Sequence, residues 1–374
     1  MGKLAELLKT TQATPHTPSL PVPEPETHNS SIEGTHNNSD YDAILTTCGH
    51  DPARVTFAAP PAVTTRWKLD GTQVTSYRYK LIPKPATTSL EPLIDRIKAQ
   101  TLHKPATTSV SNPHFLVFQA GDLQIGKRSR DGSTEQIVER YMQSVERIVE
   151  EYEDLKRHGI EGIQVSMPGD CIEGIVSQGG MNMWLTQETI TEQTRIYRRL
   201  MLHTVEALAP LTDKMYLDVT GGNHDQATRQ MNTYPGDNWA TECAIAVKDA
   251  LEMNPGAYGH VEVRVPDKWS GSMTVPVGSS VVTVVHGHQW ARGKGMTWLR
   301  DQDFGHQDAR GTQVLQHGHI HTWELETTRE VTRVASPTYD CGSDWFREVR
   351  GGDSKRGGLA YLLREGEVSR MSLV

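Results

Sequence analysis

Five short polar clusters follow apolar stretches of this sequence, and their side chains are types that bind metal ions. A mixture of carboxylate, amide and imidazole ligands suits a pair of divalent ions bridged by a carboxylate better than one tetrahedral structural zinc. The clusters are Gly121-Asp122-Leu123-Gln124, Gly169-Asp170-Cys171-Ile172-Glu173, Gly222-Asn223-His224-Asp225, His286-Gly287-His288 and Gly318-His319-Ile320-His321.

Each cluster alone has an ordinary explanation. A Gly-Asp pair is a common turn former, and alternating histidines such as His319 and His321 are more often surface or packing residues than ligands. Five such clusters in one chain, each at the end of an apolar stretch, favour a shared metal site.

The elements that must position these side chains follow an α/β pattern from about residue 113. Apolar strands alternate with amphipathic helices, and the second half is rich in strands, which predicts a two-sheet α/β sandwich rather than a barrel. Polar residues at the carboxyl ends of such strands converge on one edge. We expect strands at 115–118, 163–167, 215–219, 261–265, 273–277, 281–285, 314–315, 323–326 and 359–363, and helices from Ser133 to about 155, at 187–208 and at 237–252.

The N-terminal third differs in composition. Residues 1–40 are rich in Pro, Thr, Ser and Asn, which predicts a disordered tail. Residues 41–112 form a predicted arm, with a hairpin around Asp70-Gly71 and a short helix at 89–100. A docking or spacer role for this arm and a contact with nucleic acid both remain open. The main domain is expected at 113–374.

Composition limits the function classes. With 38 Lys+Arg against 46 Asp+Glu the net charge is -8, so no global basic field indicates nucleic-acid binding. The four cysteines form no C-x-x-C pair, which argues against a zinc ribbon or a disulfide framework. We see no signal peptide or membrane span and expect a cytoplasmic protein without membrane partners.

The ordered motifs D-x-(H or Q), G-D-x-x-(D or E), G-N-H-D, H-G-H and G-H-x-H resemble those of the calcineurin-like metallophosphoesterases, over about residues 113–330. That resemblance implies an α/β/β/α sandwich and a metal-dependent phosphoric ester hydrolase with two metal ions. It also implies the roles: Asp122, Gln124 and His321 hold the first ion, Asp170 bridges both, Asn223, His286 and His319 hold the second, and His224, oriented by Glu173, protonates the leaving oxygen.

Two positions depart from the family pattern. Gln124 replaces the usual His, and its amide oxygen is a weaker and harder ligand, so the first ion is expected to be loosely held. Manganese is the expected metal, with magnesium, iron and zinc as alternatives. Glu173 replaces the usual Asp and is one methylene longer.

The motifs do not settle the substrate. The Gly222-Asn223-His224-Asp225 region resembles the nuclease subunit of double-strand-break repair complexes, and the Gly121-Asp122-Leu123-Gln124 opening is similar to bacteriophage-encoded phosphoesterases. These resemblances favour a DNA exonuclease or endonuclease, with His288, Arg229 and Lys127 as candidate substrate contacts. They imply a homodimer or a partner ATPase as partners, and the host cytoplasm as the setting of a phage protein. A small-molecule or cyclic-nucleotide phosphodiesterase or phosphatase remains an alternative, and a non-catalytic scaffold is a third.

Overall fold

In the computed structural model the chain divides into two units, Met1–Pro92 and Leu93–Val374. The predicted arm 41–112 is therefore shared between the two units. The structure describes residues 27–33, 40–52, 55–57, 60–68, 70–83, 91–104, 111–175, 186, 188–228, 234–343, 347–348 and 353–374.

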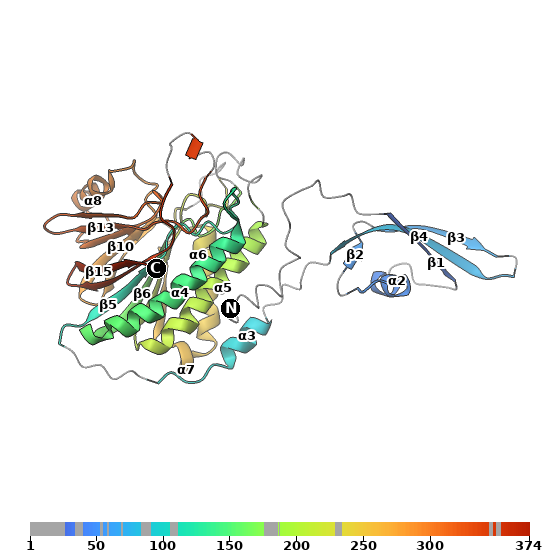
Figure 1. Ribbon diagram of the computed structural model, residues 1–374, viewed down its shortest axis with the longest axis horizontal. Coiled ribbons are helices and arrows are strands. Elements are labelled where there is room, and N and C mark those ends of the chain that lie inside the picture. Colours follow the sequence, from blue (N-terminus) through green and yellow to red (C-terminus); the bar gives the residue numbers. More distant parts are fainter. Residues whose placement is uncertain are drawn as a thin grey trace. The chain divides into compact units, whose positions relative to one another are not determined.

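Within its described residues, the smaller unit consists of a four-stranded antiparallel sheet and one helix (Figure 1). The longest strand pairs with the other three. Its buried residues form a separate small core that includes Ile32, Leu45 and Tyr77. The elements are β1 (Thr27–Glu33), α2 (Tyr41–Thr47), β2 (Val55–Phe57), β3 (Ala62–Trp67) and β4 (Gln73–Pro83).

The predicted hairpin is confirmed, because Trp67 of β3 pairs with Gln73 of β4 across a turn in which Gly71 has a φ of 82°. The prediction of disorder over 1–40 is wrong for Thr27–Glu33. These residues pair with β4 along their whole length, and Ile32 enters the small core. Backbone pairing stabilises this strand although most of its side chains are polar. Residues 1–26 and 34–39 lie outside the described residues.

The larger unit contains two sheets (Figure 1). The six-stranded sheet has the order β15-β14-β5-β6-β7-β8, and β5 to β8 run parallel. The five-stranded sheet has the order β12-β13-β11-β10-β9, with β10, β11 and β13 parallel. The strands are β5 (His114–Gln119), β6 (Ile160–Pro168), β7 (Met215–Thr220), β8 (Val261–Arg264), β9 (Ser272–Val277), β10 (Ser280–Val285), β11 (Val314–His317), β12 (Glu324–Thr327), β13 (Thr332–Ala335), β14 (Leu359–Arg364) and β15 (Glu367–Leu373).

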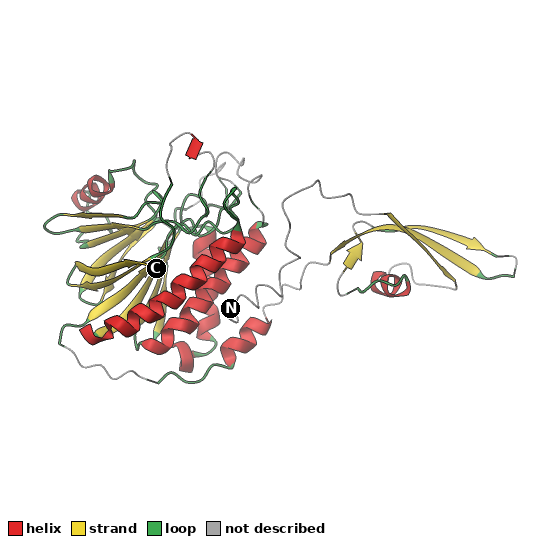
Figure 2. Ribbon diagram, in the orientation of Figure 1, coloured by secondary structure: helices red, strands yellow, loops and turns green. Residues whose placement is uncertain are grey.

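Helices cover the outer faces of both sheets (Figure 2). Long amphipathic helices lie along the six-stranded sheet, and the first of them begins at the predicted capping box of Ser133 and Gln136. The sequence did not predict α8, which packs Leu299 against Val285 and Leu315 of the five-stranded sheet. The α/β/β/α sandwich is confirmed. Its helices are α3 (Glu91–Lys98), α4 (Thr134–Leu155), α5 (Ile190–Leu208), α6 (Trp239–Glu252), α7 (Pro255–Tyr258) and α8 (Gly295–Phe304).

The two sheets are joined by an apolar core that contains a buried hydrogen-bonded network. Valine, leucine and aromatic side chains of both sheets, such as Val117 and Val284, pack together. At the end of β5, Gln119 Nε2 donates to the carbonyl oxygens of His317 and Val334, both at 3.1 Å. This contact holds the carboxyl ends of β5, β11 and β13 next to one another.

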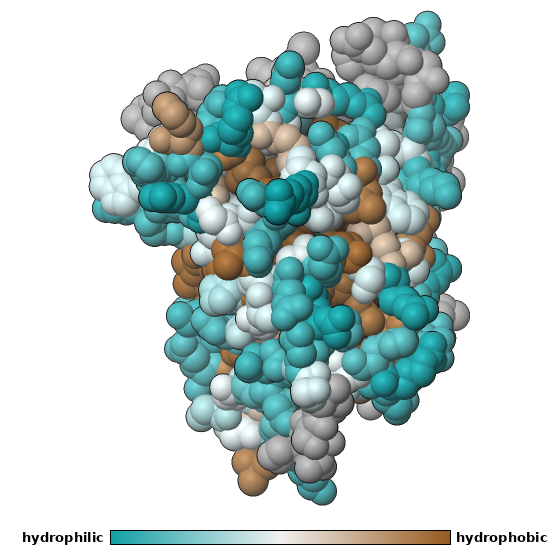
Figure 3. All heavy atoms as spheres, turned by 90° about the vertical axis from the view of Figure 1, so that its left-hand side faces the viewer, coloured by the Kyte–Doolittle hydropathy of each residue, from teal (hydrophilic) through white to brown (hydrophobic). Residues whose placement is uncertain are grey.

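The surface shows no single extended apolar area on the face at the left of Figure 1, where hydrophobic residues are scattered among hydrophilic ones (Figure 3). Among the described helices, none is both long enough and apolar enough to cross a lipid bilayer.

Candidate metal centre

The loops that follow β5 and β6 run side by side, as a continuation of the parallel pairing of these strands. The amide of Asp122 donates to the Gly169 carbonyl at 3.1 Å, and the amide of Gln124 donates to the Asp170 carbonyl at 2.9 Å. Pairing therefore continues past the strand ends and fixes Asp122 next to Asp170.

Several candidate ligands have a backbone conformation that is unfavourable for residues other than glycine. Left-handed backbone at such residues costs about 1–3 kcal/mol each and is concentrated at functional sites. The positive φ angles at the predicted metal ligands are 53° for Asp122, 46° for Gln124, 49° for Asp170, 70° for His319 and 53° for His321. The fold therefore stores local strain where these side chains converge.

Asp170, His286 and His319 form what we call the second ligand group. One ligand atom from each lies within 4.8 Å of the others. His286 is fully buried, and its Nδ1 lies 2.8 Å from the Pro168 carbonyl, so that Nε2 points towards Asp170 Oδ2 at 3.1 Å. A carbonyl partner places the proton on Nδ1 and leaves Nε2 free to bind a metal ion.

The predicted ligands Asp122, Gln124 and His321 make up what we call the first ligand group. His321 Nε2 lies 3.2 Å from Asp122 Oδ1, and the amide of His319 donates to Asp122 Oδ2 at 2.8 Å. Gln124 Oε1 accepts a hydrogen bond from Lys127 Nζ at 2.5 Å. This group lies next to the second group because Asp122 and Asp170 occupy neighbouring loops.

Glycine is required at two positions where the backbone passes a ligand carboxylate. A Cβ atom on Gly222 would lie 2.1 Å from Asp170 Oδ1, and one on Gly318 would lie 2.3 Å from Asp122 Oδ2. The predicted ligand Asn223 directly follows the first of these glycines. The glycines of the sequence motifs therefore make room for the ligands themselves.

His224 lies next to the second ligand group and contacts Glu173. Its Nδ1 lies 2.9 Å from the Glu173 carbonyl oxygen and 3.4 Å from Glu173 Oε2, whereas Nε2 lies 3.9 Å from Asp170 Oδ2. Burial alone would lower the pKa of His224, but the carboxylates of Asp170 and Glu173 raise it to about 9. At neutral pH the ring therefore carries a proton.

Two buried carboxylates of the site were not assigned a role from the sequence. Asp225 accepts hydrogen bonds from the amides of Cys171, Ile172 and Gly222, and so ties together the loops after β6 and β7. Its place in the G-N-H-D motif was the available signal. Asp340 lies beyond β13, outside the recognised motifs, and only the fold brings it to His321.

The charges of the site favour bound cations. Burial alone would raise the pKa of Asp170, yet His286 and His224 hold it well below its ordinary value. Asp122 Oδ1 and His286 Nε2 are buried without a hydrogen bond, although each faces another ligand atom. Buried charge and unsatisfied polar atoms are costly unless paired or bound to a metal ion. The residues therefore fit divalent ions. The acidic side chains buried here are Asp122, Asp170, Glu173, Asp225 and Asp340.

The predicted substrate contacts have different surroundings. His288 lies beside both ligand histidines of the second group, with ring centroids 5.4 Å from His286 and 6.3 Å from His319. Lys127 is largely buried and forms an ion pair with Asp340. Arg229 lies outside the described residues.

No protein-family model matches this sequence, and no curated protein matches it. Among solved structures, an archaeal phosphodiesterase is similar at 10% identity, with 69% of this chain and 99% of that chain covered and a TM-score of 0.31. YfcE, a phosphoesterase from E. coli, is 13% identical over 69% and 99% of the two chains, with a TM-score of 0.30. Vps29 from Cryptosporidium parvum is 15% identical over 70% and 98%, with a TM-score of 0.30. At these scores the likenesses add no argument to the geometry described above.

Proposed function

We propose that this protein is a two-metal phosphoesterase that hydrolyses phosphodiester bonds, with DNA as its substrate. The observation that carries the proposal is the convergence of Asp122, Asp170, His286, His319 and His321 at the carboxyl ends of strands from both sheets. When bound, two divalent ions lower the pKa of water and neutralise charge on phosphoryl oxygens.

The chain's own residues have the remaining tasks. Asp170 belongs to the second ligand group, and its loop is hydrogen-bonded to the loop of Asp122, so its carboxylate is the one that two ions would share. His224 presents Nε2 to the site while Glu173 holds Nδ1, an arrangement suited to proton donation to a departing alkoxide. His288, beside the second ligand group, is placed to contact a phosphoryl oxygen.

A nucleic-acid substrate is supported by an exposed aromatic pair, Tyr234 and Trp269. The rings of Tyr234 and Trp269 are 45% and 66% exposed, with centroids 4.6 Å apart. Lys268 Nζ lies 4.9 Å from both centroids. An exposed aromatic surface beside a lysine is the combination that binds single-stranded nucleic acid through stacking and phosphate contact.

The aromatic pair is joined to the loops that carry the metal ligands. The Gly236 amide donates to the Lys268 carbonyl at 3.2 Å, which links the segments of Tyr234 and Trp269. The Trp239 amide, at the start of α6, donates to the Asp225 carbonyl at 2.9 Å. Backbone hydrogen bonds therefore link the segments that carry these rings, through the start of α6, to the loop of Asp225.

One observation favours the alternative of a small phosphodiester. Arginines near the first ligand group are neutralised by neighbouring acids: Arg347 and Arg356 contact Asp131 and Asp353. With a net charge of -8, such pairing leaves little positive potential to attract a long polyanion.

Hydrolysis of bis(p-nitrophenyl) phosphate, single-stranded DNA and double-stranded DNA with added Mn²⁺ tests the proposal. We expect all turnover to stop with EDTA and in Asp170→Asn. Trp269→Ala should raise KM for single-stranded DNA by about tenfold, because a stacked base contributes about 1–3 kcal/mol. It should leave the small diester unaffected, as should the control Phe304→Ala at an 88% exposed aromatic on α8. Turnover of the small diester alone would favour the small-molecule alternative, and no turnover would favour a scaffold.

A further inference from the structure

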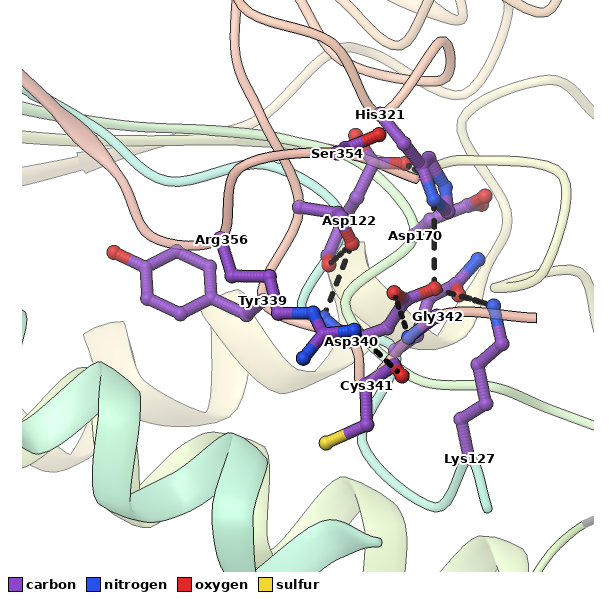
Figure 4. Close-up of polar contacts among 12 residues, drawn as sticks. Asp122, Lys127, Asp170, His321, Tyr339, Asp340, Cys341, Gly342, Ser354 and Arg356 are labelled. Carbon is purple, nitrogen blue, oxygen red and sulfur yellow. Dashed lines mark hydrogen bonds and ion pairs between the residues drawn. The ribbon is translucent and has the colours of Figure 1, made fainter. Parts of the chain in front are cut away.

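A partly buried lysine and a buried aspartate form an ion pair against the first ligand group (Figure 4). The side chain of Lys127 is 14% exposed and that of Asp340 is 1% exposed. Lys127 Nζ contacts Asp340 Oδ2 and also Gln124 Oε1. Neither charge is therefore simply part of the solvated surface, and the pair directly contacts a predicted metal ligand.

Asp340 also contacts the histidine of the same group. Its Oδ2 lies 3.4 Å from His321 Nδ1, while the opposite nitrogen of that ring faces Asp122. Its Oδ1 accepts a hydrogen bond from the Gly342 amide at 2.8 Å, which fixes the carboxylate. A carboxylate at Nδ1 holds the proton there and directs Nε2 to a metal ion.

Lys127 acts on the amide ligand. An ammonium group only donates hydrogen bonds, so its partner on Gln124 must be the amide oxygen. One lone pair of this oxygen is then engaged, and a fixed positive charge stands beside the first position. The described hydrogen bonds and ion pairs of Asp170, His286 and His319 include no lysine or arginine.

We propose that the Lys127–Asp340 pair makes the two metal positions unequal. The second position binds its ion tightly, whereas the first binds weakly and exchanges its ion, with an affinity set by this pair. Lys127 lowers that affinity through its charge and its hold on Gln124, and Asp340 raises it through His321. This inference rests on the proposed two-metal site.

Metal binding to the full-length protein, stripped with chelator, tests the inference without any assay of turnover. Calorimetric titration with Mn²⁺ should resolve a tight and a weak step, and about one ion per chain should survive desalting. In Lys127→Met the weak step should tighten by about tenfold or more, because a like charge is removed at short range. In Asp340→Asn it should weaken by about 10–100-fold, the usual effect of removing the partner of a ligating histidine.

The tight step should change much less than the weak step in both variants, because Lys127 acts on Asp170 only at longer range, without a hydrogen bond or ion pair among the described contacts. Lys156→Met is the matched control, since Lys156 is an exposed lysine paired with Glu153 at the end of α4. If Lys127→Met fails to fold, Lys127→Gln keeps a polar side chain and serves as the second variant. Two equal steps in the unchanged protein, or a Lys127 variant that leaves the weak step as it was, would overturn the inference.

The outcomes separate this inference from the proposed function. Unequal binding that responds to Lys127 and Asp340, without hydrolysis of any phosphodiester, would support the inference and remove the function. Hydrolysis with two ions bound equally would do the reverse.

Discussion

The two ligand groups lie at the ends of neighbouring strands, yet different partners orient them. In the second group His286 is fully buried, and its Nδ1 contacts the backbone carbonyl of Pro168. In the first group the side chain of His321 is 26% exposed, and its Nδ1 contacts the carboxylate of Asp340. The carbonyl partner of His286 is held in place by the backbone, whereas the carboxylate partner of His321 also adds a negative charge beside the first group.

This difference indicates that the surrounding side chains, rather than the ligand types alone, decide how a position holds an ion. Asp122 and Asp170 occupy equivalent places after β5 and β6, and their loops are joined by hydrogen bonds. The two groups differ in the residues around these aspartates, because Lys127 contacts Gln124 in the first group. Equivalent changes to the two groups should therefore have unequal effects.

The largest effect is expected at the second group. Asp170→Asn and His319→Ala should each reduce turnover of a phosphodiester by on the order of a thousandfold or more, because the first removes the charge of a ligand and the second removes a neutral imidazole ligand. Gln124→Ala should cost only about tenfold, and excess Mn²⁺ should recover part of it. Steady-state kinetics over a range of Mn²⁺ concentrations measures both. Equal losses in the two groups would contradict the comparison.

A large effect that depends on the substrate is expected at His224. If its ring donates the proton to the leaving oxygen, His224→Ala should slow a substrate with an alkoxide leaving group by about 10²–10⁴-fold. A p-nitrophenyl ester, whose leaving group needs no proton, should lose much less. The ratio of the two rates is the measurement, and similar losses for both esters would show that His224 is not the acid. Metal content should remain that of the unchanged protein.

The sequence predicted the parts of the fold that repeat a strong local pattern. The strand before each metal motif and the helix after Ser133 are found as expected, because periodic apolar residues and a capping box determine them locally. The same motifs predicted that the candidate ligands lie at one edge, because the carboxyl ends of parallel strands lie at the same edge of a sheet.

What the sequence did not predict depends on contacts between distant segments. β1 is polar and becomes a strand only by pairing with β4, about fifty residues later in the chain. Asp340 follows no recognisable motif, and it reaches the site because the amide of Tyr339 donates to the Asp122 carbonyl at 3.0 Å. Lys127 looked like a surface cation because its buried partner was unknown.

A smaller effect should come from restoring imidazole to the first group. Gln124→His should tighten the first position by about tenfold and move its preference from Mn²⁺ towards Zn²⁺, because imidazole is a softer and stronger ligand than an amide oxygen. Competition between the two ions, followed by metal analysis after desalting, measures the change. Gln124→Glu is the control, which adds charge without adding a softer ligand. An unchanged metal preference in Gln124→His would show that Gln124 is not a ligand.

The smallest expected effect is the release of a single proton when the first position binds its ion. Burial alone would lower the pKa of His321, but Asp122 and Asp340 raise it to about 10, whereas burial and the nearby His286 lower the pKa of His319 to about 4. At neutral pH the metal-free protein therefore holds a proton on His321. Because binding at the first position requires a free Nε2, it should release that proton. In the second group His319 has no proton to lose. Burial alone would lower the pKa of His286, but Asp170 raises it to about 9, so binding at the second position should also release a proton.

The apparent affinity of the first position should then fall about tenfold for each unit of decreasing pH below about 10, since proton and metal ion compete for one nitrogen. Calorimetry of the weak step in buffers with different ionisation enthalpies counts the protons released. His321→Gln should abolish the release in that step and leave the tight step unchanged, because His286 belongs to the other group. A weak step that released no proton in the unchanged protein would show that His321 does not bind the weakly held ion.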